Sequence, residues 1–162
     1  MAVMMESNTN SYTIIEAPFP APSKSSTGLV NSHATTCTLL SFTNKLFLTI
    51  TQSGRNLSHW VHVPLATSPT DSRHITSGND ENALLPRSDL TATTVLGGTK
   101  EDEDVVGQTL ATIVGSAILT KRPGEERLLV LGLGLEMDGG RGGVVIERNG
   151  FEELVGLVLE CL

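Results

Sequence analysis

Aromatic residues, basic clusters and long apolar runs are scarce in this chain, and each scarcity excludes a class of protein. Aromatic residues make up 4% of the 162 residues, which argues against a stacking platform for single-stranded nucleic acid. No run reaches the roughly 18 apolar residues that a membrane-spanning helix needs. The first ten residues lack the basic flank and apolar stretch of a secretory signal. We therefore expect a soluble protein of the cytoplasm that also occurs in the nucleus.

Positive charge is scarce as well. The chain has 11 Lys and Arg against 18 Asp and Glu, which gives a formal net charge of -7. Nucleic-acid binders neutralise several phosphates with clustered cations, whereas the basic residues here are spread along the chain. Attraction to an anionic membrane surface is disfavoured for the same reason. The expected partners are neither nucleic acids nor membranes.

Cysteine is represented only by Cys37 and Cys161. In an intracellular protein such residues are expected to be reduced and buried. A cysteine nucleophile needs a base close by in space, and the sequence leaves that arrangement open. A pocket that holds Cys37 or a histidine beside a carboxylate would favour a small enzyme, whereas a solid core around Cys37 would not.

The length and the hydrophobic content of 39% suit one folded domain. Residues 1–34 are expected to form a partly disordered N-terminal segment, with an edge strand at Tyr12–Glu16 as one option and a loop at Ser23–Ser32. Residues 35–162 are expected to form the domain. Within it, residues 66–89 are rich in Ser, Thr, Pro, Asp and Asn, which predicts a long flexible surface loop.

Alternating apolar residues predict three strands in the first half of the domain. They cover Thr35–Phe42, Lys45–Gln52 and Leu57–Leu65, and short turns at Thr43-Asn44 and Ser53–Asn56 separate them. Because antiparallel strands that follow one another usually pair, we expect these three to form a meander.

The second half mixes helices and strands. Four carboxylates at Glu101–Asp104 precede an apolar period of helical spacing, and Pro123-Gly124 ends it, which predicts a helix with acidic residues in its first turn. Arg127–Glu136 is apolar without alternation, which is typical of a central strand. Further elements are predicted at Leu90–Leu96 (strand), Val144–Ile146 (short strand) and Phe151–Leu162 (helix). The fold class is α+β: a mostly antiparallel sheet of about five to six strands with two helices packed against it.

Three patterns that resemble cofactor or metal sites have simpler explanations. His59 and His62 are three residues apart on a strand and so point to opposite faces, while His33 and His74 lie in predicted loops. The glycines around Gly132 match neither a dinucleotide fingerprint nor a phosphate-binding loop. The carboxylates before the helix fit a helix start better than a calcium loop. We expect no catalytic residue, no metal and no cofactor.

Two features point to an interface with another protein. Gly107, Ala111 and Gly115 recur every four residues along the predicted helix. Glycine inside a helix costs about 1 kcal/mol relative to alanine, so something is expected to pack closely there: either the C-terminal helix of the same chain or a helix of a partner. Trp60, which shares a strand face with His62, is the second candidate because half-exposed aromatic residues are frequent interface anchors.

The order of these segments resembles the proteasome assembly chaperone 3 family. Thr36–Leu65 is similar to the family's N-terminal strands, including the apolar strand that ends in Thr51-Gln52-Ser53-Gly54. Leu90–Glu136 is similar to the middle of the family, with an acidic helix start, an amphipathic helix and an apolar strand. The closing helix fits too. The related chaperone 4 shares the strand and helix order, and Leu46–Leu48 and Arg55–Leu57 would also suit it.

The resemblance implies a role without catalysis. Members of that family pair with a sister chaperone, chaperone 4, and the pair binds α-type subunits of the 20S proteasome and promotes formation of the α-ring. A chaperone 4-like chain and α-type subunits are therefore the expected partners. A small protein-binding adaptor unrelated to the proteasome is the alternative.

Overall fold

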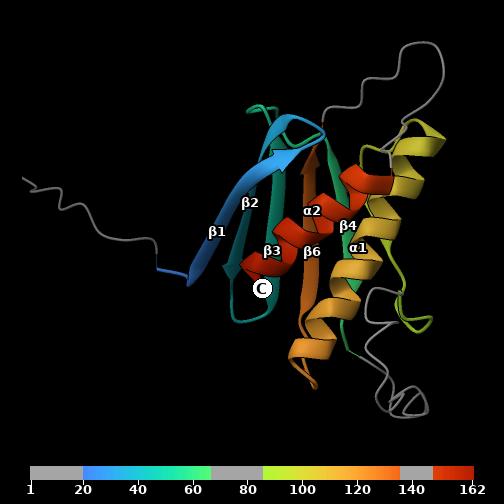
Figure 1. The fold of residues 1–162 in the computed structure, drawn as a ribbon. Coiled ribbons are helices and arrows are strands. Elements are labelled where there is room, and N and C mark those ends of the chain that lie inside the picture. The colour runs from blue at the N-terminus through green and yellow to red at the C-terminus, as the bar shows by residue number, and fades with distance from the viewer. Residues whose placement is uncertain (1–19, 67–85, 136–147) are drawn as a thin grey trace, which may run out of the picture.

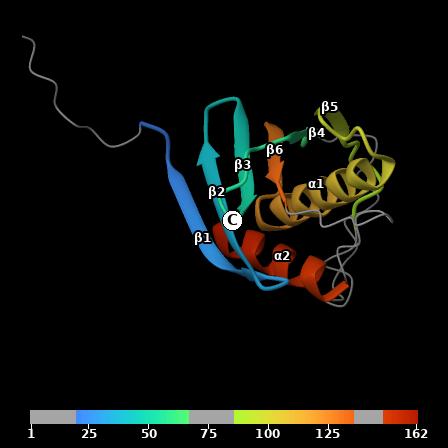
Figure 2. The same cartoon turned by 90° about the horizontal axis from the view of Figure 1, so that it is seen from above.

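The computed structural model describes residues 20–66, 86–135 and 148–162. These form one sheet of six strands with two helices, which confirms the predicted α+β class. Both helices lie against the same face of the sheet (Figures 1 and 2). The elements are β1 (Ser23–Val30), β2 (His33–Ser41), β3 (Lys45–Gln52), β4 (His59–Pro64), β5 (Thr93–Leu96), α1 (Glu101–Lys121), β6 (Leu128–Gly134) and α2 (Arg148–Cys161).

The predicted three-stranded meander is wrong in its last step. The strand order is β1-β2-β3-β6-β4-β5, so β6 lies between β3 and β4. It pairs parallel with β3 and antiparallel with β4. The connection from β3 to β4 passes the end of β6, where the amide of Ser58 donates to the carbonyl of Leu133 at 3.0 Å. A continuously apolar strand gains most from burial on both faces, and the place between β3 and β4 provides that burial.

The predicted loop at Ser23–Ser32 is also wrong, because its first eight residues form β1. This strand pairs with β2 along its whole length, from Ser23 opposite Leu40 to Val30 opposite His33. Asn31 and Ser32 connect the two strands with φ angles of 49° and 66°, as a two-residue hairpin turn requires. The polar composition of an edge strand concealed it. Tyr12–Glu16, His74 and Val144–Ile146 lie outside the described residues, as do residues 67–85 of the predicted loop.

The predicted helix is confirmed. It is α1, which begins at the acidic residue Glu101 and ends at Lys121, before Pro123. From Leu110 to Leu119 its apolar residues are buried, and the small residues Gly107, Ala111 and Gly115 beside them are buried as well. The buried surface is therefore wider than one stripe, because α1 packs against both β4 and α2. Part of the segment before β5 also rests on α1: the amide of Arg87 donates to Ser116 Oγ at 2.8 Å.

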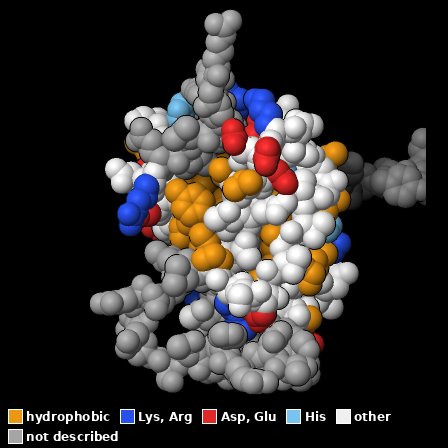
Figure 3. All heavy atoms as spheres, turned by 90° about the vertical axis from the view of Figure 1, so that its right-hand side faces the viewer, with side chains coloured by type: hydrophobic (Ala, Val, Ile, Leu, Met, Phe, Trp, Pro, Cys, Tyr) orange, Lys and Arg blue, Asp and Glu red, His pale blue; other side chains and the backbone are white. Residues whose placement is uncertain are grey.

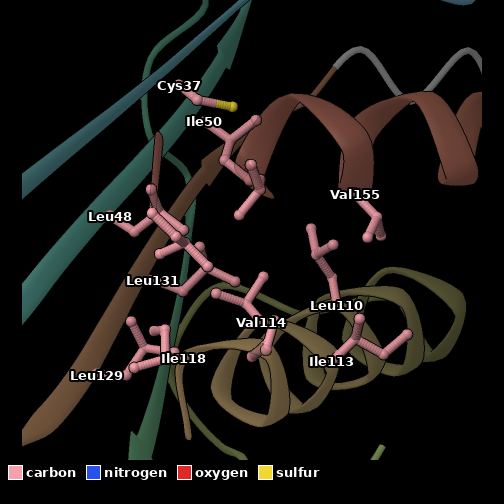
Figure 4. Packing of buried hydrophobic residues seen from close by; sticks show 14 of the residues in the cluster. Cys37, Leu48, Ile50, Leu110, Ile113, Val114, Ile118, Leu129, Leu131 and Val155 are labelled. Atoms are coloured by element: carbon pink, nitrogen blue, oxygen red, sulfur yellow. The ribbon is translucent and has the colours of Figure 1, made fainter. Parts of the chain in front are cut away.

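The core lies between the sheet and the two helices. β6 is central, as predicted, and its Leu129 and Leu131 are both 0% exposed. Figure 4 shows side chains from the strands meeting Leu110, Val114 and Ile118 of α1 and Val155 of α2. In the described part of the chain, neither helix is long and apolar enough to cross a membrane.

Helix α2 packs over β1 and β2, and hydrogen bonds from polar side chains hold it there. Ser26 Oγ donates to the carbonyl of Leu157 at 2.8 Å, and Lys24 Nζ donates to the carbonyl of Leu162 at 2.9 Å. From α1, Lys121 Nζ reaches the carbonyl of Leu159 at 3.0 Å. Cations near the unpaired carbonyls at the end of a helix complement its dipole. The result is a layer of two helices that leaves the opposite face of the sheet free of described elements.

Candidate interaction surface

The sheet face opposite the helices is less buried than the face beneath them, as the alternation of burial along β3 shows. Leu46, Leu48 and Ile50 are each 0% exposed beneath the helices, whereas the residues between them, Phe47 and Thr49, are half-buried. No described helix or strand packs over this second face (Figure 2). We call it the open sheet face and define it by the residues at its centre: Leu40, Phe47, Trp60, His62, Leu128, Val130 and Gly132.

Trp60 and Phe47 form the middle of the open sheet face. Their ring centroids are 5.5 Å apart and the rings are tilted by 40°, although β6 lies between their strands. Gly132, the residue of β6 opposite Trp60, makes this approach feasible. A Cβ atom at Gly132 would lie 2.9 Å from Trp60 Cζ3, closer than packed carbon atoms tolerate. The small residues of β6 therefore have a structural function, and no phosphate loop is needed to explain Gly132.

The strand register extends this apolar centre in both directions. Leu40 lies opposite Phe47, Phe47 opposite Val130, and Val130 opposite His62. Trp60 lies opposite Leu96 at the β5 edge. Toward β1 the face becomes rich in hydroxyl groups, with Thr36, Thr38, Thr49 and Thr51 on neighbouring strands. Lys45 and His62 are the only ionisable side chains that the described strands place on this face, so its centre is apolar and nearly uncharged.

The structure places Trp60 and His62 together on this face, as the sequence predicts, and their role in an interface stays a prediction. Sequence reasoning missed Phe47, Val130 and Leu96. The sequence did contain a signal for Phe47, because the alternation along this strand assigns it to the face opposite Leu46 and Leu48. What was absent from the sequence was the strand order, because Phe47 and Trp60 become neighbours only when β6 separates β3 from β4.

The row of small residues on α1 is buried within the chain. A Cβ atom at Gly107 would lie 2.2 Å from Cε1 of His59, and one at Gly115 would lie 3.1 Å from Cδ1 of Leu90. Ala111, between them, is 0% exposed. The close neighbours of the two glycines are therefore β4 and the residues before β5, rather than α2 or a partner helix. This packing explains the glycines without a second chain, and any effect of the row on pairing stays a prediction.

His59 and His62 do lie on opposite faces of the sheet. His59 is 3% exposed under α1, where its Nε2 is 3.3 Å from Thr94 Oγ1 and 3.6 Å from Asp104 Oδ1. Thr94 also hydrogen-bonds to Asp104. The carboxylate therefore lies on the Nε2 side together with the hydroxyl, while buried Nδ1 has no partner among the described residues. A nucleophile, base and orienting acid need the carboxylate on the other ring nitrogen, so this cluster is structural.

The cluster makes the junction of β5 and α1 sensitive to acid. The hydrogen bond from Thr94, supported by Gln108 and by His59, lowers the pKa of Asp104 below its ordinary value of 3.8. A carboxyl group whose pKa is lowered by folding stabilises the fold above its unfolded pKa and loses that contribution as the pH falls through its folded pKa. We therefore expect the stability difference between the wild type and Asp104→Asn to be full above pH 3.8 and to shrink in more acidic solution. Urea unfolding of both proteins between neutral and acidic pH measures it, and a difference that is constant over this range contradicts the assignment.

The described residues show neither a metal-binding cluster nor an exposed thiol. They contain no group of three or more side chains suited to a metal ion. Cys37 and Cys161 are both unpaired and buried, as predicted. Burial raises the pKa of the Cys37 thiol to about 12, so the thiolate that a nucleophile requires is not formed near neutral pH. Cys37 lies in the solid core (Figure 4), so it does not supply a nucleophile.

The fold and this face together define an α+β domain in which the two described helices cover one side of a six-stranded sheet. No family model matches the sequence, and no curated protein does. Among solved structures, the chain is similar in fold to a protein in the crystal structure of a novel chaperone complex for yeast 20S proteasome assembly. The TM-score is 0.54 at 14% sequence identity, over 86% of this chain and 98% of that one. At this identity the likeness is one of fold.

Proposed function

We propose that this chain is a non-enzymatic chaperone of 20S proteasome assembly that pairs with a sister chaperone. Together they bind α-type subunits and promote formation of the α-ring. Two independent features support the proposal: the similarity of segments such as Thr36–Leu65 to proteasome assembly chaperone 3, and the fold that the chain shares with a protein of a proteasome assembly chaperone complex. The proposal places the chain in the cytoplasm and the nucleus.

The open sheet face is the observation that carries the pairing step. Two sheets pack face to face when each presents apolar side chains, and the centre of this face presents the half-buried Trp60 and Phe47 with little charge. Aromatic residues are enriched at the centres of protein interfaces, and charged residues are depleted there. The sister chaperone would cover this face and leave other surfaces of the pair for the α-type subunits.

Such a chaperone acts by selective binding alone. A rigid surface that binds correctly neighbouring subunits more tightly than incorrect ones biases the order of assembly through the difference in affinity. Each 1.4 kcal/mol of difference changes the preference about tenfold. The role therefore requires preformed surfaces and no reactive group, which agrees with the burial of Cys37 and His59.

The test is an affinity purification of the tagged full chain from its own cells, followed by mass spectrometry. The wild type is expected to recover a second small chaperone and α-type proteasome subunits without mature β-type subunits. Trp60→Asp introduces a charge at the centre of the open sheet face and is expected to reduce recovery of the second chaperone at least tenfold. The matched control is Gly156→Asp on α2, on the other side of the sheet, where nothing lies within 4 Å of the new Cβ atom; it adds the same charge and is expected to have no effect on recovery of the second chaperone.

Each result has a defined meaning once circular dichroism shows that the variants are folded. If folded Trp60→Asp recovers the second chaperone as well as the wild type does, the open sheet face is not the pairing surface. If the wild type recovers neither a second chaperone nor α-type subunits from cells that are making proteasomes, the assembly role is refuted. Recovery of another specific partner through Trp60 would instead support the adaptor alternative.

A further inference from the structure

A second exposed apolar surface lies where β5 meets the start of α1. Among the described residues, the exposed large hydrophobic side chains are Leu29, Val95, Leu96 and Val105, at 70%, 56%, 61% and 58%. Leu29 belongs to the opposite edge strand, whereas the other three lie within eleven residues of one another on β5 and α1. We call this surface the β5–α1 corner and define it by Val95, Leu96, Glu101, Asp102 and Val105.

The corner is held in place by tight backbone contacts. Gly97 and Gly98 connect β5 to α1 with φ angles of 82° and 62°, which side chains other than glycine rarely adopt. A Cβ atom at Gly97 would lie 2.3 Å from the carbonyl oxygen of Ser58. Thr94 of β5 is bonded to Asp104 of α1, and Gln108 Nε2 donates to the same carboxylate at 2.8 Å. The exposed valines are therefore presented by a preformed surface, which lowers the entropy cost of binding.

Glu101 and Asp102 lie one turn before Val105 on α1, so the charge beside Val105 is negative. Lys100 pairs with Glu103 at 3.3 Å, but Glu101 and Asp102 are exposed and form no ion pair with any described residue. Figure 3, which views this side of the molecule, shows acidic side chains gathered beside exposed hydrophobic ones. Two carboxylates next to an apolar surface are complementary to a segment that carries cations next to apolar side chains.

We propose that the β5–α1 corner binds a short segment of a partner protein in which apolar residues alternate with lysine or arginine. The apolar side chains would cover Val95 and Val105, and the cations would pair with Glu101 and Asp102. This contact is separate from pairing through Trp60, although Leu96 borders both surfaces. It does not depend on the proposed function, because its chemistry is set by the corner alone.

The experiment measures binding of a synthetic probe to the intact chain by fluorescence anisotropy. The probe is a fluorescein-labelled nine-residue peptide that alternates lysine with valine, and a peptide with glutamate in place of lysine is its counterpart. We expect saturable binding of the lysine peptide only. The double variant Glu101→Lys/Asp102→Lys should weaken it at least tenfold and should bind the glutamate peptide instead. Val95→Ser/Val105→Ser should weaken it about tenfold while leaving the charge unchanged.

A chain of net charge -7 attracts any basic peptide weakly, so the charge variant needs a matched control. Glu126→Lys/Glu160→Lys changes the net charge by the same amount, at two exposed residues that follow α1 and end α2, and is expected to bind the lysine peptide almost as the wild type does. The proposal is overturned if both charge variants weaken binding equally, if the valine variant binds like the wild type, or if the wild type shows no saturable binding.

Discussion

Gly107→Ala is expected to destabilise the protein, although alanine is the better helix former. The new methyl group would lie 2.2 Å from Cε1 and 2.7 Å from Nδ1 of His59, and that ring is 3% exposed and enclosed between β4 and α1. Overpacking of a closed core costs roughly 1–3 kcal/mol and occasionally more, while the gain in helix propensity is about 1 kcal/mol. At so short a distance the clash dominates, and we expect a net loss of about 1–2 kcal/mol in the free energy of unfolding.

Gly156→Ala in α2 is the matched control, because it makes the same change where nothing lies within 4 Å of the new Cβ atom. It is expected to stabilise the protein by about 0.5–1 kcal/mol. Gly115→Ala should fall between the two, since its neighbour at 3.1 Å is the flexible end of Leu90. Urea unfolding ranks the three variants. A Gly107→Ala protein as stable as Gly156→Ala would show that His59 does not limit the approach of α1.

Leu131→Ala is expected to have the largest effect on stability of any single change considered. Leu131 is 0% exposed on the central strand β6, where it lies opposite Leu48 of β3 and Val61 of β4, and Figure 4 shows its side chain between the sheet and α1. Truncating a buried leucine removes its transfer free energy and leaves a cavity, which together cost about 3–5 kcal/mol. Since small domains have a total stability of about 5–15 kcal/mol, the variant would lose between about a fifth of its stability and nearly all of it.

The control for this truncation is Leu29→Ala, at a leucine that is 70% exposed on β1. We expect a change within about 0.5 kcal/mol there. The measurement is the urea midpoint together with the slope of the transition, because an altered slope would signal a change in the unfolded state instead of lost packing. If Leu131→Ala lowers the free energy of unfolding by less than about 1 kcal/mol, Leu131 does not lie in the core as described.

Local patterns in the sequence were enough to predict the class of fold and most of its elements. Helical spacing from Val106 to Ile118 specified α1, because only a helix brings those residues onto one side. Alternation specified β3 and separated Leu48 from Phe47, and the unbroken apolar run around Leu131 specified a central strand. These patterns are local, so a short window of residues is enough to fix them. The burial of Cys37 and the opposite orientation of His59 and His62 followed from the same local rules.

The order of the strands, in contrast, could not be predicted from local patterns. The insertion of β6 between β3 and β4 depends on residues about 80 positions apart in the chain, and no local pattern records such pairing. It brings Phe47 and Trp60 together across Gly132, and it turns half-buried residues into one apolar face. The polar strand β1 was hidden for a related reason: its stability comes from pairing with β2 and from contacts such as Ser26 with α2. The glycines of α1 likewise predicted a close contact. That the contacts are with His59 and Leu90 follows only from the packing of the helix on the sheet.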